Sequence, residues 1–302
     1  MLKSRGLLFW LIAPLLLLTA MAVVAAAALK IAIARNPGDL FTREGILKIQ
    51  ARESVVLYSD GKTKVGTFFE GAHRDYVVFD SIPRPIVDAL VAAEDHNFWN
   101  HGGVDFKGLA YAMLDNLKSM RLKRGGSTLT QQTAKNLFGR RGRTIRGKIG
   151  ETVNAYRLER HFTKQEILEF YLNQFFVSGN GHGVQIAARY FFNKKLSELD
   201  LLECAFIAGS VKGPNQYNPF IQDTPEKKDA ALQRGRYRVA YVLKQMRRQE
   251  KITEAEYQQA LARRLEFHRG DFRFRLSTNM VKVKRMLETP EMQAILTELA
   301  TL

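Results

Sequence analysis

The chain has 302 residues, enough for one sizeable domain with appendages and a hydrophobic core of its own. Its formal net charge of +16 at pH 7 calls for an anionic partner, and nucleic acid is the usual partner of so basic a chain. We reject nucleic acid because residues 7–29 form a 23-residue uncharged stretch, and a membrane-anchored basic domain is better suited to phospholipid head groups and other membrane-borne anions.

Residues 7–29 are predicted to form a transmembrane helix. At 1.5 Å per residue the stretch covers a hydrocarbon core of roughly 30 Å. The alanine run at 25–28 also resembles a signal-peptide cleavage site, but the apolar stretch is longer than the usual signal core of about 7–15 residues. We therefore expect an uncleaved anchor, with residues 1–35 forming a cytoplasmic stub and the anchor. Basic residues flank both ends equally, so charge alone does not orient it.

After the anchor, residues 36–80 are predicted to be a linker and a small β-hairpin. The strands are expected at 54–58 and 64–69, on either side of a turn signal at Asp60-Gly61. From Ser81, a plausible N-cap, the periodicity is mainly helical. The predicted fold class is therefore mainly α, with a catalytic domain at 81–222 and a helical C-terminal extension at 223–302.

Two polar-rich stretches, 94–105 and 125–136, suggest an active site. The first follows the apolar run 86–93, which places Glu94 at the inner end of a helix, where a carboxylate loses hydration. That setting suits a general base. The second stretch begins with two glycines and continues with hydroxyl, amide and ammonium side chains.

The two stretches carry a family resemblance. The first fits E-D-x-x-F-x-x-H-x-G-x-D at every fixed position and the second fits G-G-S-T-x-T-Q-Q-x-x-K-N, with further matches as far as about Pro219. In these motifs the chain resembles the family 51 glycosyltransferases, the peptidoglycan glycosyltransferases that polymerise lipid II. The resemblance implies a lysozyme-like helical domain, inversion at C1 of the donor sugar and release of polyprenyl pyrophosphate.

The resemblance also implies roles for individual residues. Glu94 would deprotonate the acceptor hydroxyl, and Glu151 would orient the pyrophosphate site or hold a divalent cation there, Mg²⁺ or Mn²⁺, with no organic cofactor. Lys135, Arg143 and Lys148 would supply positive charge that stabilises the anionic leaving group. Neutral hydrogen bonds to sugar and phosphate would come from Ser127, Thr128, Gln131 and Gln132.

One position departs from the family pattern. The family has R-K-x-x-E where this chain has Gly147 in place of the arginine, followed by the matching Lys148 and Glu151. Arg146 is adjacent and is a candidate for the same phosphate, although a helix turns about 100° per residue, so the exchange is not geometrically neutral. An isolated K-x-x-E would usually be only a surface ion pair.

Residues 106–124 form an apolar stripe with a basic end. They fit either a buried core helix or a segment that dips into the membrane. Cys204 lies in an apolar run and is expected to be an inert buried thiol. His101 is expected to be a hydrogen-bonded brace rather than a ligand.

Three functional classes remain in view: a polymerase, a glycan-cleaving lysozyme-like enzyme, and a weakly active lipid II-binding scaffold suggested only by Gly147. The cluster of lysine and arginine favours the first, because a pyrophosphate leaving group needs positive charge whereas hydrolysis needs an acid and water. The expected partners are lipid II, the nascent glycan strand, the membrane and a transpeptidase, without nucleic acid. The expected location is the inner membrane, single-pass, with the catalytic domain on the outer face.

Overall fold

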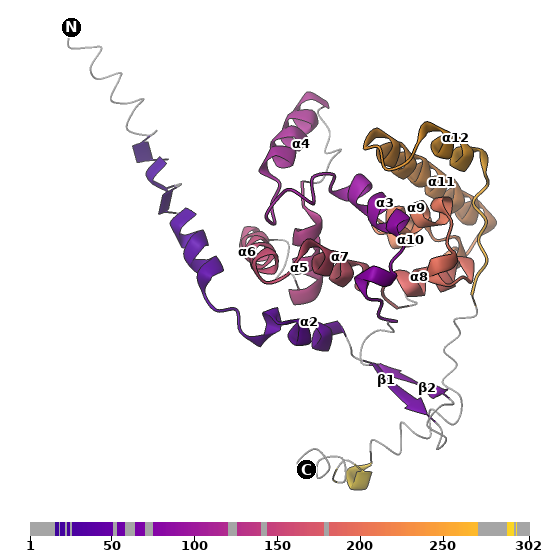
Figure 1. Ribbon diagram of the computed structural model, residues 1–302, viewed down its shortest axis with the longest axis horizontal. Coiled ribbons are helices and arrows are strands. Elements are labelled where there is room, and N and C mark those ends of the chain that lie inside the picture. The colour runs from indigo at the N-terminus through magenta and orange to yellow at the C-terminus, as the bar shows by residue number, and fades with distance from the viewer. Residues whose placement is uncertain are drawn as a thin grey trace. The chain divides into compact units, whose positions relative to one another are not determined.

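The structure is a computed structural model (Figure 1), and it describes residues 16–17, 19–21, 23–24, 26–50, 53–57, 64–69, 75–119, 126–139, 144–177, 181–270, 289–292 and 294. These residues are mainly helical, which confirms the predicted class. The chain divides into two compact units. The first comprises Met1–Leu47 and Leu90–Gln174, and the second comprises Lys48–Ala89 and Phe175–Leu302.

The predicted strands are present as β1 (Glu53–Leu57) and β2 (Lys64–Phe69). They pair antiparallel, with Glu53 opposite Phe69 and a register shift between Val56 and Leu57. The residues between the strands lie outside the described part of the chain.

The predicted membrane anchor is only partly covered. Its residues 7–15, 18, 22 and 25 lie outside the described part. Among the residues that are described, no helix has both the length and the apolar character needed to cross a membrane. The anchor therefore stays a prediction.

In the first unit, α5 (Leu129–Phe138) packs against α6 (Ile145–His161) and α7 (Lys164–Leu172), as Figure 1 shows. α3 (Arg84–Glu94) ends in this unit and α4 (Phe106–Ser119) belongs to it. The core consists of fully buried apolar side chains, among them Leu129, Leu158, Ile167, Leu168 and Phe170. A threonine followed three positions later by a glutamate predicts a capping box, and Thr163 and Glu166 form one at the start of α7.

The segment before α3 also supplies contacts to the first unit. Phe41, at the end of η1 (Asp39–Phe41), stacks on Phe138 with ring centroids 4.5 Å apart. Arg43, the first residue of α2 (Arg43–Gln50), donates to Glu169 Oε1 at 2.7 Å. Glu169 is only 3% exposed, so this bond gives its buried carboxylate a structural role.

The second unit is a helical cluster around aromatic side chains. Its helices are η2 (Phe79–Ser81), α8 (Val184–Phe192), η3 (Leu196–Glu198), α9 (Leu201–Ser210), α10 (Pro214–Tyr217), η4 (Pro219–Ile221), α11 (Pro225–Arg248) and α12 (Glu254–Ala262). α11 packs on α9, and Phe206 meets Phe191 and Phe267 edge-on at 5.0 and 4.9 Å between ring centroids. Cys204 is fully buried here, as expected.

Two helices of the predicted C-terminal extension have boundaries that differ from the sequence pattern. The amphipathic pattern of 234–249 predicts a helix, but this helix begins earlier, at Pro225, because the Thr224 side chain accepts from the Lys227 N–H and proline is favourable in a first helical turn. The pattern of 253–265 predicts a second helix, which ends at Ala262, and residues 264–270 continue without helix. The tail at 279–302 also has a helical pattern, but it lies mostly outside the described residues.

Candidate active site

Asp95 joins the two sequence motifs. It follows Glu94, the half-buried last residue of α3, and is 7% exposed. Its Oδ2 accepts from His101 Nε2 at 2.9 Å and from the Leu129 backbone N–H at 2.8 Å. The stretch that begins at Glu94 therefore lies beside the start of α5, which carries the second motif.

His101 uses both ring nitrogens inside the protein. Its Nδ1 accepts from the Gly103 N–H at 3.1 Å, so the proton resides on Nε2 and is donated to Asp95. His101 is 8% exposed. Its contacts fit the expected bracing role better than metal ligation or proton transfer.

Gly103 closes the same loop against α6. Its φ of +104° lies in the left-handed region, and a Cβ there would stand 3.2 Å from the Ala155 carbonyl carbon. Its carbonyl oxygen accepts from Thr128 Oγ1 at 2.6 Å. Glycine is therefore required, because both the backbone conformation and the close approach exclude a side chain.

Thr128 and Gln131 form a capping box at the start of α5. Thr128 Oγ1 accepts from the Gln131 N–H, and Gln131 Oε1 accepts from the Thr128 N–H, each at 3.1 Å. Gln131 Nε2 also donates to Thr152 Oγ1 at 3.2 Å, and Tyr171 OH donates to Gln132 Oε1 at 3.2 Å. These contacts give Thr128, Gln131 and Gln132 a structural role, and their predicted contacts with substrate stay predictions.

The third motif, which contains Lys148 and Glu151, contacts the second motif at Ser127. From α6, Lys148 Nζ donates to Ser127 Oγ at 2.8 Å and to Glu151 Oε1. The Glu151 side chain is 5% exposed and that of Lys148 is 39% exposed. A buried carboxylate is thereby paired with an ammonium that still faces solvent, which is the arrangement needed to present positive charge to a bound anion.

The other predicted cations are placed less tightly. Lys135 is exposed in the last turn of α5, Arg146 is exposed in the first turn of α6, and Arg143 lies outside the described residues. Arg146 precedes Lys148 by two positions, which on a helix corresponds to about 200°. The two side chains therefore leave α6 on nearly opposite faces.

Sequence reasoning missed two braces behind the motifs. Glu159 Oε1 accepts from Thr130 Oγ1 at 2.6 Å and from Lys164 Nζ at 2.7 Å. Lys164 also donates to the His101 carbonyl oxygen at 2.5 Å and lies 4.5 Å from the centre of the Phe98 ring. The available signal was Lys164 itself, which opens the matched stretch K-x-x-I-L-E-x-Y-L-N.

α4 presents an apolar surface. Phe106, Tyr111, Met113 and Leu114 are 65%, 71%, 65% and 54% exposed, whereas Ala112 is buried. Two predictions were open for residues 106–124, a buried core helix and a segment that dips into the membrane. The buried core helix is wrong for the part up to Leu114, because most of its large apolar side chains are exposed. The basic end at 120–124 lies outside the described residues.

The described residues bring few side chains together that could ligate a metal ion. Within the described part of the chain, no three histidine, cysteine, aspartate or glutamate side chains gather as a metal site. Mg²⁺ and Mn²⁺ commonly use one or two carboxylates together with substrate phosphates, so Glu151 alone fits only a site that the substrate completes.

The chain is similar to known proteins of a single family. A model of the transglycosylase family matches residues 61–247. Penicillin-binding protein 1A from Aquifex aeolicus is 43% identical over 188 residues, covering 62% of this chain and 25% of that protein. The protein of the same name from Neisseria flavescens is 35% identical over 215 residues, covering 71% and 26%. That from Pseudomonas aeruginosa is 38% identical over 193 residues, covering 63% and 23%.

The chain spans about a quarter of the length of these curated relatives. Among solved structures, penicillin-binding protein 1A from Haemophilus influenzae aligns with a TM-score of 0.42 at 24% identity, over 76% of this chain and 23% of that one. A superposition at this level supports no conclusion about the fold.

Proposed function

Because this chain belongs to the transglycosylase family, we propose that it is a peptidoglycan glycosyltransferase that polymerises lipid II into glycan strands. The observation that carries the proposal is the pairing of Lys148 with both Ser127 and the buried Glu151, which sets a cation of the third motif beside the second. A lysozyme-like arrangement of the helical core is part of the same proposal.

In the proposed reaction, Glu94 accepts the proton of the 4-hydroxyl of the acceptor lipid II sugar. The freed oxygen attacks C1 of the terminal sugar of the growing chain, and the bond from C1 to the lipid pyrophosphate breaks with inversion. General-base catalysis of this kind contributes about 10²- to 10⁴-fold. The half-buried position of Glu94 beside the fixed Asp95 supports the role, because the base must be held at a constant place.

The pyrophosphate leaves with negative charge, which Lys148, Lys135 and Arg143 would stabilise. Glu151 orients Lys148 through their ion pair, which supports its role as an orienting group. A divalent cation bound by Glu151 and the substrate phosphates would supply further positive charge. Hydrolysis of a glycan has no use for such a cluster of cations, so the lytic alternative is disfavoured.

The membrane is the proposed setting. The exposed side chains of Phe106, Tyr111, Met113 and Leu114 suit a helix lying in the boundary between head groups and acyl chains. Together with the predicted anchor they would keep the catalytic unit close to a substrate whose polyprenyl tail stays in the bilayer. We place the protein in the inner membrane with this unit on the outer face, where a transpeptidase would be its partner.

Turnover of lipid II by the purified full-length chain tests the proposal. A polymerase forms a ladder of glycan strands and releases one polyprenyl pyrophosphate per bond. A lytic enzyme leaves lipid II intact and shortens preformed glycan, and a scaffold binds lipid II without product. Either of the last two results would refute the proposal.

A further inference from the structure

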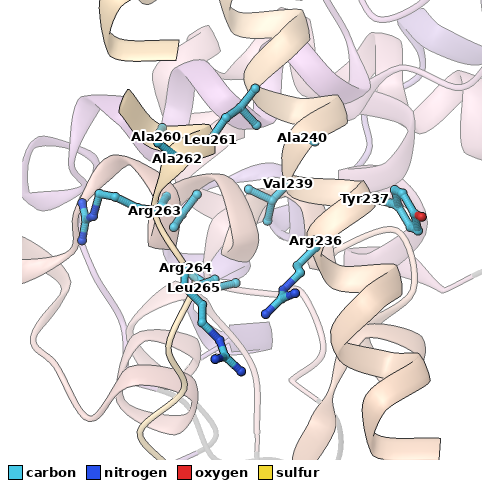
Figure 2. Close-up of a pocket in the computed structure, with 11 residues that line it drawn as sticks. Arg236, Tyr237, Val239, Ala240, Ala260, Leu261, Ala262, Arg263, Arg264 and Leu265 are labelled. Carbon is cyan, nitrogen blue, oxygen red and sulfur yellow. The ribbon is translucent and has the colours of Figure 1, made fainter. Parts of the chain in front are cut away.

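A cavity of about 620 Å³ lies in the second unit, lined by none of the candidate catalytic residues. Its walls come from α11, from the end of α12 and from the segment that follows α12, and Leu202 of α9 completes the lining. Figure 2 shows these side chains. The volume falls within the range of about 300–1,000 Å³ that is usual for ligand pockets.

The cavity has an apolar floor and a cationic rim. Leu202, Val239, Ala260 and Leu265 are each less than 10% exposed. The remaining lining residues are Arg236, Tyr237, Ala240, Leu261, Ala262, Arg263 and Arg264, so the lining holds three arginines and no carboxylate. A ligand that fills it should therefore combine an apolar body with a negative charge.

Two of the three arginines in the lining are available to bind a ligand. Arg263 donates to Asp200 at 2.7 Å, which ties the segment after α12 to the N-cap of α9. Within the part of the chain that the structure describes, the side chains of Arg236 and Arg264 make no hydrogen bond or ion pair, and Figure 2 shows them extending toward the same side of the cavity. Their planar guanidinium groups suit bidentate recognition of a carboxylate.

We propose that this cavity binds an acidic peptide segment of a partner protein, with an aliphatic side chain on the floor and a carboxylate against Arg236 and Arg264. An apolar centre surrounded by a polar rim that contains tyrosine and arginine is the usual anatomy of a peptide or protein interface. A membrane is a poorer fit, because the four apolar side chains of the floor are buried, whereas a bilayer is met by apolar side chains that project.

The probe is a fluorescein-labelled hexapeptide in which glutamate and leucine alternate, titrated with the full-length chain in non-ionic detergent and followed by fluorescence anisotropy. The pocket variant carries Arg236→Glu and Arg264→Glu. A matched control carries Lys244→Glu and Arg248→Glu, which lie exposed on the same helix outside the cavity and change the net charge equally. Thermal unfolding of both variants checks that the fold is retained.

We expect saturable binding that the pocket variant weakens at least tenfold, since each charge-assisted contact contributes about tenfold or more. The control should bind as the wild type does, and a peptide with glutamine in place of glutamate should bind weakly to all three. Lipid II turnover should be the same in both variants and in the wild type.

Four results would overturn the proposal. The first is the absence of saturable binding of the peptide. The second is an equal loss of peptide affinity in the pocket and control variants. The third is that the same two arginines bind phosphatidylglycerol vesicles but not the peptide. The fourth is loss of lipid II turnover in a folded pocket variant, which would assign the cavity to the reaction. Since turnover is measured separately, failure of this proposal leaves the proposed glycosyltransferase activity unaffected.

Discussion

Replacement of Lys148 by methionine is the most informative perturbation of the proposed leaving-group site. The substitution keeps most of the length of the side chain but removes the ammonium that contacts Ser127 at 2.8 Å and Glu151. Loss of one preorganised electrostatic contact of this kind lowers turnover by about 10²- to 10³-fold. Turnover is measured from the appearance of glycan polymer at saturating lipid II.

The same change has a separate cost in stability. Glu151, with a side chain 5% exposed, would be left as a buried carboxylate without its ammonium. A group left unpaired costs about 1–3 kcal/mol in the free energy of unfolding, and the 39% exposure of Lys148 favours the lower end of that range.

The double variant Lys148→Met with Glu151→Gln removes the unpaired charge. It should therefore recover stability in urea unfolding without recovering turnover. If Lys148→Met turns over lipid II at the wild-type rate, or if turnover returns together with stability, the role of Lys148 in stabilising the leaving group is wrong.

Three further predictions concern other parts of the chain. Arg146→Ala should leave turnover nearly unchanged and Gly147→Arg should raise it, because Arg146 points away from Lys148; a strong loss in Arg146→Ala would show that it substitutes for the missing arginine. Burial raises the pKa of the Cys204 thiol to about 12, so it should resist the disulfide reagent dithiobis(nitrobenzoate) at pH 8 until the chain is unfolded. The free energy of unfolding should decline as the pH rises from 9.0 toward 12, because the thiol ionises in the unfolded chain before it does in the folded one. Rapid labelling of the folded chain would contradict its burial. Replacing Met113 and Leu114 by serine should weaken binding of an anchor-deleted chain to liposomes about tenfold, as expected for two exposed apolar side chains that enter the bilayer boundary; unchanged binding would remove α4 from the membrane contact.

Local chemistry made parts of the structure predictable. The capping box at Thr163 follows from a threonine with glutamate three positions later, and the pairing of Lys148 with Glu151 follows from their spacing on a helix. The exposure of α4 was one of two readings, because an apolar stripe does not reveal whether a partner covers it.

Contacts distant in sequence were not predictable in the same way. The bond from the Leu129 N–H to Asp95 joins residues 34 positions apart, and that from Lys164 to the His101 carbonyl joins residues 63 positions apart. Periodicity gives no sign of such pairings, so Asp95, Glu159 and Lys164 were recognised as braces only from the fold. Arg263 with Asp200, which shapes the second-unit cavity, is a contact of the same kind.

The central claim is that Glu94 is the general base of a lipid II polymerase, and the Glu94→Gln variant tests it most directly. The amide is nearly isosteric but cannot accept the proton, so polymer formation should fall by about 10²- to 10⁴-fold while thermal unfolding and binding of lipid II stay close to wild type. Polymer formation at the wild-type rate by a folded Glu94→Gln chain would contradict the assignment and the mechanism that rests on it.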